Sequence, residues 1–221
     1  MNIIRELRKS IAAEVHPDLS VVIKAPTEAS DTQINAFIKR KEAWIEKQKK
    51  YFQQFNRKEP TEFLSGSSVL YLGRQYQVII EKAAYKNRIK VTKNRLYILS
   101  SAPQKSDEIT ADFQRWLLSR AEVVFAQRLT ECLKSFPNLS PPKLKIRRLK
   151  KRWGSYLKRH EIVLNPDLIK ASKQAIDYVI IHELCHTFYP RHDEDFYRLL
   201  SSKMPNWKEI KAKFEKKLLC Y

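Results

Sequence analysis

Three of the five histidines of the chain fall within eleven positions, in the stretch IIHELCHTFYPRH (residues 180–192). His182 and His186 are four residues apart, so on a helix they project from one face and can bind one zinc ion at about 2.0–2.1 Å. Glu183 is rotated by about 100° from His182, which suits a general base acting on a zinc-activated water. A catalytic zinc takes three protein ligands, and His192 is the expected third. The stretch therefore predicts a hydrolytic Zn²⁺ site of the HExxH type.

The spacing of these histidines equals that of the metzincin pattern H-E-x-x-H-x-x-G-x-x-H. Tyr189 stands where that pattern has a glycine that permits a sharp turn, so Pro190 is expected to supply the turn instead. The competing interpretation, histidines hydrogen-bonded within a core, is weaker because a third histidine rarely follows a chance HExxH so closely. Cys185 is expected to be a small buried side chain, and His16 and His160 are expected to be ordinary surface residues.

Apolar periodicity predicts the elements that hold this stretch. A helix is expected from Lys173 to Phe188, with Ser172 as its N-cap, and a longer one over residues 108–136. Residues 143–165 indicate two strands between these helices. Two short helices should close the chain, the first capped by Asp193.

The N-terminal half has a different pattern. A strand over residues 19–26 precedes Ser30 and Gln33, which match a capping box at the start of a helix over residues 31–55. Residues 68–99 form short β runs that predict a small antiparallel meander. Together with the C-terminal pattern, these elements predict an α+β fold.

A polar segment over residues 100–107 marks the predicted domain boundary. It separates an N-terminal α+β region, residues 1–105, from a metal-dependent hydrolase domain, residues 106–221.

The chain is strongly basic, with a formal net charge of +19 over 221 residues. This charge indicates anionic partners or simply a solvated basic surface. Seven of the ten residues from Lys143 to Arg152 are basic, and a turn at Trp153-Gly154 is expected to bring them near the metal. Arginines bind phosphate and carboxylate in a bidentate manner. Possible substrate-binding or anion-binding residues are therefore Arg147, Arg148, Lys151, Arg152, Trp153 and Gly154.

The remaining composition excludes several classes of protein. No apolar run is long enough to cross a membrane, and the N-terminus lacks the features of a secretory signal, so no membrane partner and a cytoplasmic location are expected. Three separated cysteines do not suggest a disulfide framework. With three glycines in the chain, a glycine-rich phosphate loop is not expected.

The segments RWGSY, IVLNPDLI, IDYVIIHELCHTFYPRHDEDFY and MPNW resemble the YgjP-like family of zinc-dependent metallopeptidases, relatives of the SprT and WLM zincins. The resemblance covers nearly the whole chain. It implies a zincin-like C-terminal domain, in which the active-site helix packs on a long helix and a small antiparallel sheet. It also implies that His182, His186 and His192 ligate zinc and that Glu183 is the catalytic acid/base.

The same resemblance places further residues beside the site. Arg152, Trp153, Gly154 and Ser155 fall on the recurrent R-W-G-S positions of the family, and Asn165 falls on its L-N position. The chain departs from the family at two positions. Tyr156 stands where a cysteine is common, and Tyr189 stands where another histidine is frequent.

Three functions fit these observations. The first is a zinc metallopeptidase acting on a peptide or protein, with an oxyanion assisted by an arginine or a tyrosine such as Tyr189. The second is a metal-dependent nucleoside triphosphate pyrophosphohydrolase, suggested by the basic run beside the metal. The third is a basic nucleic-acid-binding protein with a zinc site, or a protease recruited to DNA, which predicts salt-dependent binding. The sequence leaves the oligomeric state open.

Overall fold

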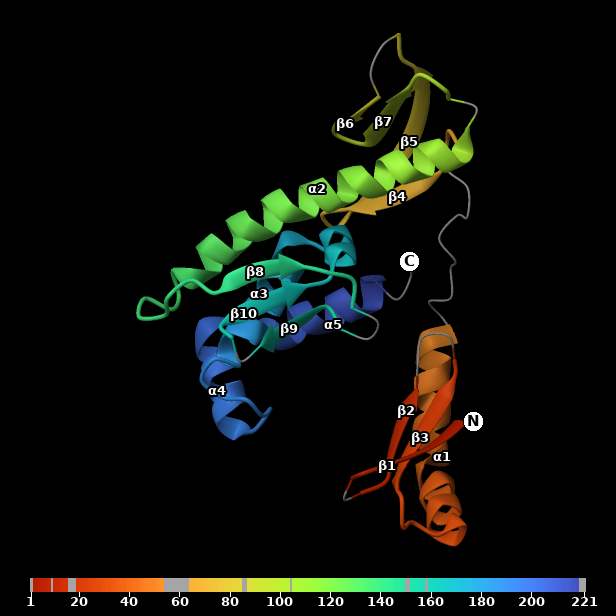
Figure 1. Ribbon diagram of the computed structural model, residues 1–221, viewed down its shortest axis with the longest axis vertical. Helices are drawn as coiled ribbons and strands as arrows, with labels where there is room; N and C mark the ends of the chain where they lie inside the picture. Colours follow the sequence, from red (N-terminus) through yellow and green to blue (C-terminus); the bar gives the residue numbers. More distant parts are fainter. Residues whose placement is uncertain are drawn as a thin grey trace. The chain divides into compact units, whose positions relative to one another are not determined.

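The computed structural model describes residues 2–8, 10–15, 19–53, 64–84, 87–103, 105–149, 152–157 and 159–218 (Figure 1). The described elements form a mixed α+β fold, as the sequence predicts. Contacts between residues divide the chain into two units. The smaller comprises Met1–Glu59 with Lys216–Tyr221, and the larger comprises Pro60–Glu215.

The smaller unit is built on a three-stranded sheet and one helix. Its strands are β1 (Asn2–Glu6), β2 (Ala12–Val15) and β3 (Val21–Pro26), in the order β1-β3-β2 with β1 parallel and β2 antiparallel to β3. Helix α1 spans Asp31–Gln53. Alternate residues of β3 are buried with apolar residues of α1, so the core consists of Val21, Ile23, Ala25, Ala29, Ile34 and Ile45.

The capping box at the start of α1 is confirmed. The backbone N–H of Gln33 donates to Ser30 Oγ at 3.3 Å, and the backbone N–H of Ser30 donates to Gln33 Oε1 at 3.0 Å. The two side chains thus satisfy each other's free backbone donors. His16 lies outside the described residues.

The larger unit begins with a four-stranded sheet. Its strands are β4 (Ser68–Tyr71), β5 (Arg74–Lys82), β6 (Arg88–Val91) and β7 (Arg95–Ser100), in the order β4-β5-β7-β6. The predicted antiparallel meander is wrong in one connection, since β5 and β7 pair in parallel. Burial explains why β7, and not β6, pairs with β5. Leu96 and Ile98 of β7 are at most 1% exposed and need the centre of the sheet, whereas β6 is largely exposed and lies at its edge.

This sheet packs on the long helix α2 (Ser106–Leu133) and on the 3₁₀ turn η1 (Pro166–Lys170). The N–H groups of Leu72 and Gly73 donate to the carbonyls of Ile169 and Lys170 at 2.9 and 3.0 Å. Gly73 has φ +75°, and a Cβ there would lie 2.8 Å from Ser172 Cα, so only glycine fits this turn. These contacts place the sheet in the larger unit, and the contacts do not divide the chain at the predicted boundary of 105/106.

A second, mixed sheet lies close to the histidine stretch. Its strands are β8 (Lys143–Ile146), β9 (Gly154–Leu157) and β10 (Glu161–Leu164), in the order β8-β10-β9. Strand β8 is parallel and β9 antiparallel to β10, so the expected small antiparallel sheet is in fact mixed. Two strands were expected from residues 143–165. Three form, because residues 147–149, 152 and 153, the described residues between β8 and β9, are not in a strand.

The histidine stretch begins on helix α3 (Lys173–Cys185), which contacts α2, β9 and β10. It is followed by α4 (Glu194–Lys203) and α5 (Trp207–Leu218). The N-caps predicted from sequence are confirmed. Ser172 Oγ accepts from Ala175 N at 3.2 Å, and Asp193 Oδ1 accepts from Phe196 N at 3.1 Å. Among the described residues, none of the helices combines the length and apolar content needed to cross a bilayer.

A bidentate ion pair joins the two helices that frame the site. Arg128 of α2 donates through Nε and a terminal nitrogen to both carboxylate oxygens of Asp177 on α3, each at 2.6 Å. The side chains are 27% and 15% exposed, so most of the pair is shielded from water. The pair fixes the register of α3 on α2 at a point less than two turns before His182.

We expect Asp177→Ala to lower the free energy of unfolding by about 1–3 kcal/mol, because it leaves a half-buried guanidinium without its partner. Urea denaturation followed by circular dichroism measures the change. Lys134→Ala removes an exposed pair with Glu131 at the C-terminal end of the same helix and is expected to cost much less, because water screens an exposed pair. If both variants lowered the free energy of unfolding equally, the Arg128–Asp177 pair would be worth no more than an exposed pair, contrary to this expectation.

Candidate metal centre and active-site pocket

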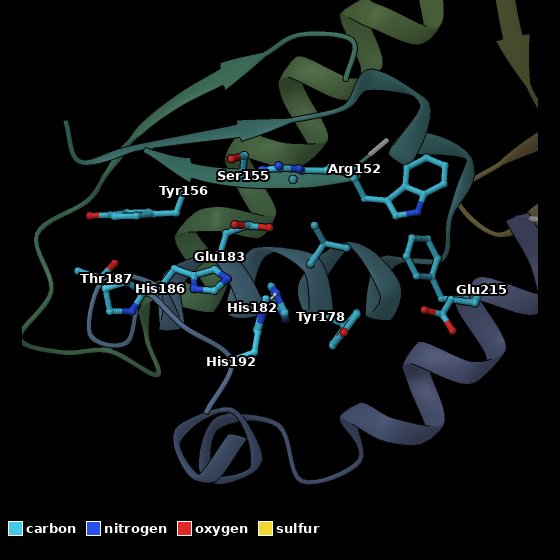
Figure 2. Close-up of a pocket in the computed structure, with 15 residues that line it drawn as sticks. Arg152, Ser155, Tyr156, Tyr178, His182, Glu183, His186, Thr187, His192 and Glu215 are labelled. Carbon is cyan, nitrogen blue, oxygen red and sulfur yellow. Dashed lines mark hydrogen bonds between the residues drawn. The ribbon is translucent and has the colours of Figure 1, made fainter. Parts of the chain in front are cut away.

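A pocket of about 890 Å³ opens along α3 (Figure 2). Its walls come from β9 and the two residues before it, from the middle and end of α3, from the segment that follows α3, and from α5. This volume is in the range of pockets that bind small molecules or short peptide segments. His182, His186, His192 and Glu183 all line it.

The three histidines converge at one point. Within the described residues, His182, His186 and His192 form the cluster that could hold a metal ion, with one ring nitrogen from each within 4.8 Å of the others. The Nε2 atoms of His182 and His192 lie 2.9 Å apart. Nitrogens bound at about 2.0–2.1 Å to a tetrahedral zinc ion are separated by roughly 3.3 Å. The arrangement therefore fits a shared metal ion.

Neighbouring atoms orient the histidines for this role. His186 Nδ1 donates to the backbone carbonyl of Tyr189 at 3.0 Å, which leaves Nε2 of His186 free as a ligand. Helix α3 ends at Cys185, and the turn that follows brings the exposed His192 back over the helix. Cys185 is 0% exposed and does not line the pocket, as expected for a buried apolar side chain.

The surroundings of His182 and His192 favour the neutral imidazole. Burial lowers the pKa of His182 to about 3, with smaller contributions from His186 and His192. Burial also lowers the pKa of His192. Metal ions bind the neutral imidazole, and imidazole ligands suit Zn, Cu, Fe and Ni better than Mg or Ca.

Glu183 is the buried carboxylate of the pocket, at 7% exposure. Burial raises its pKa to about 7, although a hydrogen bond from the Tyr156 backbone N–H and the positive charge of Arg152 oppose this rise. Figure 2 shows Glu183 between β9 and the histidines. A carboxylate that exchanges a proton near neutral pH has the property that a general base needs.

Gly154, the first residue of β9, allows the strand to approach this carboxylate. A Cβ at Gly154 would lie 2.9 Å from both Cγ and Oε1 of Glu183 and 3.0 Å from Val179 Cγ1. These separations are shorter than normal contacts, so any side chain at residue 154 would displace Glu183. The glycine therefore sets the position of the catalytic candidate.

We expect Gly154→Ala to lower kcat/KM by on the order of 10²-fold, because a displacement of about 1 Å is enough for such a loss. The three atoms nearest to a Cβ at this position belong to Glu183 and Val179 and not to the three histidines, so metal content should stay at the wild-type value. Peptidase assays and elemental analysis of the same preparation measure both quantities. Wild-type activity in this variant would show that Glu183 does not need its present position.

Some of the other site residues predicted from the sequence line the pocket and others do not. Of the described residues of the basic run, Arg152 lines the pocket. Arg147 and Arg148 do not, and Arg148 instead donates to Gln114 on α2 at 3.3 Å. Lys151 lies outside the described residues. Trp153, Gly154 and Ser155 line the pocket. Tyr189 does not line it, but its backbone carbonyl accepts the hydrogen bond from His186 Nδ1.

Asn165 supports the pocket from behind. Its Nδ2 donates to the carbonyls of Leu149 and Arg152 at 3.0 and 3.3 Å, and its Oδ1 accepts from Asp167 N at 3.2 Å. The side chain is 7% exposed. The hydrogen bonds to Leu149 and Arg152 hold the residues just before β9, Arg152 and Trp153, at the pocket.

Several pocket residues carried no signal in the sequence. Those not anticipated are Tyr178, Thr187, Phe214 and Glu215, and Tyr156 was noted only as a departure from the family. The ring centroids of Trp153 and of Phe214 on α5 lie 5.5 Å apart in an edge-to-face arrangement. Among the described residues, three buried side-chain polar atoms have no hydrogen-bond partner, and two of them, His182 Nδ1 and Thr187 Oγ1, belong to pocket residues. Such atoms are uncommon in folded proteins outside functional sites.

Two solved structures resemble part of the chain. The metallopeptidase zymogen of Pyrococcus abyssi abylysin is 26% identical, with a TM-score of 0.39, over 42% of this chain and 94% of the other. The zymogen of Methanocaldococcus jannaschii jannalysin is 23% identical, with a TM-score of 0.38, over 42% of this chain and 96% of the other. A comparison with curated proteins gives no significant match.

The family match is independent of these partial likenesses. Residues 9–217 match the family described as YgjP-like, metallopeptidase domain. The match includes every residue of the pocket described above. The chain therefore belongs to the YgjP-like metallopeptidase family.

Proposed function

We propose that this protein is a zinc-dependent metallopeptidase in which His182, His186 and His192 hold the metal and Glu183 is the general base. The observation that carries the proposal is the convergence of three imidazoles beside a buried carboxylate in one pocket. Three protein ligands are typical of catalytic zinc, whereas structural zinc usually has four. Its substrates would be peptides or proteins, and the expected cytoplasmic location stays a prediction.

When bound, a zinc ion supplies a Lewis acid that lowers the pKa of a coordinated water to about 7 and polarises the substrate carbonyl. Glu183 accepts one proton from the attacking water and later delivers it to the leaving amine nitrogen, so the peptide bond breaks with no net change in the enzyme. Gly154 and the Tyr156 backbone N–H hold the Glu183 carboxylate in place for both transfers.

Arg152 is the cation best placed to assist. It lines the pocket, and its charge acts on Glu183. A fixed guanidinium can stabilise the negative charge that develops on the carbonyl oxygen during attack. The side chain of Tyr189 is a weaker candidate for that role, because Tyr189 does not line the pocket.

The nucleotide-hydrolysis alternative depended on the basic run lying beside the metal. Of the described residues between Lys143 and Arg152, Arg152 reaches the pocket and the others do not line it. Nucleotide hydrolysis therefore gains no support from the described part of the chain, and nucleic-acid binding, suggested by the basic charge of the whole chain, stays a prediction. A peptidase needs no such cluster of cations.

A substrate screen tests the proposal. The zinc-loaded full chain is incubated separately with a pool of peptides and unfolded proteins and with nucleoside triphosphates, and metal content is measured on the same sample. We expect peptide fragments, loss of cleavage with a chelator, and recovery on adding Zn²⁺. Release of pyrophosphate without any peptide cleavage would overturn the proposal.

A further inference from the structure

Tyr156 lines the pocket at the opposite end from Glu215 (Figure 2). It belongs to β9, whose neighbour in the sheet is β10, with Tyr156 paired to Ile162. Its backbone N–H is taken by Glu183. The backbone position of Tyr156 is thus tied to the proposed catalytic base, while its ring forms a separate part of the pocket wall.

The hydroxyl of Tyr156 has a fixed partner. Its Oη lies 3.0 Å from Nδ1 of His160, and Nε2 of His160 lies 2.8 Å from the backbone carbonyl and 3.2 Å from the hydroxyl oxygen of Ser140. A carbonyl only accepts hydrogen bonds, so Nε2 carries a proton, and in this tautomer Nδ1 is the acceptor. The Tyr156 hydroxyl therefore donates its single proton to His160.

His160 is placed for this contact by the turn between β9 and β10. It has φ +57°, a left-handed conformation in which non-glycine residues are uncommon. The backbone N–H of Lys143 donates to the His160 carbonyl at 3.0 Å, which ties the turn to the start of β8. His160, expected from the sequence to be an ordinary surface residue, instead joins the pocket wall to the segment before β8.

We propose that Tyr156 is a substrate-binding residue that accepts a hydrogen bond from an N–H group of the peptide, and that His160 positions its hydroxyl. This inference rests on the proposed peptidase function. Because the only proton of the hydroxyl points to His160, the phenolic oxygen offers the substrate lone pairs alone. It complements an amide N–H and disfavours a carbonyl, since two acceptors would face each other.

The chemical class of substrate follows. A peptide with an unsubstituted backbone amide at the position that meets Tyr156 is preferred, so proline and N-methyl residues are disfavoured there. The tyrosine also distinguishes this chain from family members that have a cysteine after R-W-G-S. A thiol is shorter and a weak acceptor, so it would not make the same selection.

The test combines variants of the full chain with altered peptides. Tyr156→Phe keeps the ring and removes the acceptor. His160→Asn keeps a residue that tolerates positive φ and retains an acceptor oxygen, whereas His160→Gly keeps the backbone conformation and removes the acceptor. Each enzyme is assayed with the best-cleaved peptide and with analogues in which one amide N–H, away from the scissile bond, is replaced by an ester oxygen.

We expect one ester analogue to lower the kcat/KM of the wild-type enzyme by about 5- to 10-fold, the loss of one hydrogen bond. Tyr156→Phe should show the same loss on the parent peptide and no further loss on that analogue. His160→Asn should stay near wild type, and His160→Gly should resemble Tyr156→Phe. Zinc content and the midpoint of thermal unfolding should be unchanged in Tyr156→Phe.

A purely structural role would lower kcat/KM for every peptide equally, so losses from Tyr156→Phe and from each ester analogue that simply multiply would overturn the inference. So would ¹⁵N NMR of the zinc-loaded protein that places the His160 proton on Nδ1. If the wild-type protein cleaves no peptide at all, the proposed function fails and this substrate assignment fails with it. If peptides are cleaved but the losses from Tyr156→Phe and from every ester analogue are independent, the inference about Tyr156 fails while the proposed function stands.

Discussion

Glu183→Gln is expected to lower kcat by about 10²- to 10⁴-fold, the usual contribution of a general base. The substituted amide would keep the size and planar shape of the side chain but could not take a proton from the attacking water. Its oxygen could still accept from the Tyr156 backbone N–H. The peptide found in the substrate screen serves for the measurement, with zinc content determined on the same preparation.

A matched control for this variant lies on α5. Glu209→Gln makes the same chemical change at an exposed carboxylate that is paired with Lys213 and does not line the pocket. It is expected to retain wild-type kcat. Full activity in Glu183→Gln with a normal zinc content would show that another group takes the proton.

His192→Ala is expected to weaken zinc binding by on the order of 10²- to 10³-fold and to remove peptidase activity at limiting metal. The estimate follows because a binding free energy of about 10–16 kcal/mol over four ligands is roughly 3–4 kcal/mol for each. His192 follows α3 and is exposed, so the helix should fold normally without it. Competition with a chromophoric chelator measures the affinity.

Cys185→Ala provides the control for ligand number. Cys185 lies between the two helical histidines, but it is buried away from the pocket, and burial raises the pKa of its thiol to about 12. Its removal is expected to leave zinc affinity unchanged. A loss comparable with that of His192→Ala would indicate a fourth ligand, and with it a structural rather than a catalytic metal site.

The local elements around the site could be predicted because their determinants are close together in the sequence. Ser30 with Gln33, Ser172, and Asp193 each satisfy backbone N–H groups within three residues, and the structure confirms all three caps. The convergence of His182 and His186 on one face follows from the helical repeat alone. Such short-range rules need no knowledge of the rest of the fold.

The arrangement of the strands could not be predicted in the same way. The order of β5, β6 and β7 depends on which strand is covered by other elements, and that depends on contacts distant in the sequence. The basic run from Lys143 suggests a strand and an anion site, yet among its described residues only those of β8, at its beginning, pair in a sheet. The described side chains of this run do not converge on the pocket as their charge suggested.

The walls of the pocket also depend on distant contacts. Phe214 and Glu215 reach it from α5, about thirty residues along the chain after His182 and His186. His160 is hydrogen-bonded to the Tyr156 hydroxyl across one turn and to the backbone carbonyl of Ser140, twenty residues earlier in the chain. No periodicity or motif links such pairs, so their chemistry becomes visible only when the fold is known.

The amide of Asn165 has a consequence for how this protein can change over evolution. By donating to the carbonyls of Leu149 and Arg152, one buried side chain holds two points of the segment between β8 and β9. Any substitution of Asn165 removes both hydrogen bonds at once. This position therefore has little freedom to vary, although Asn165 itself does not line the pocket.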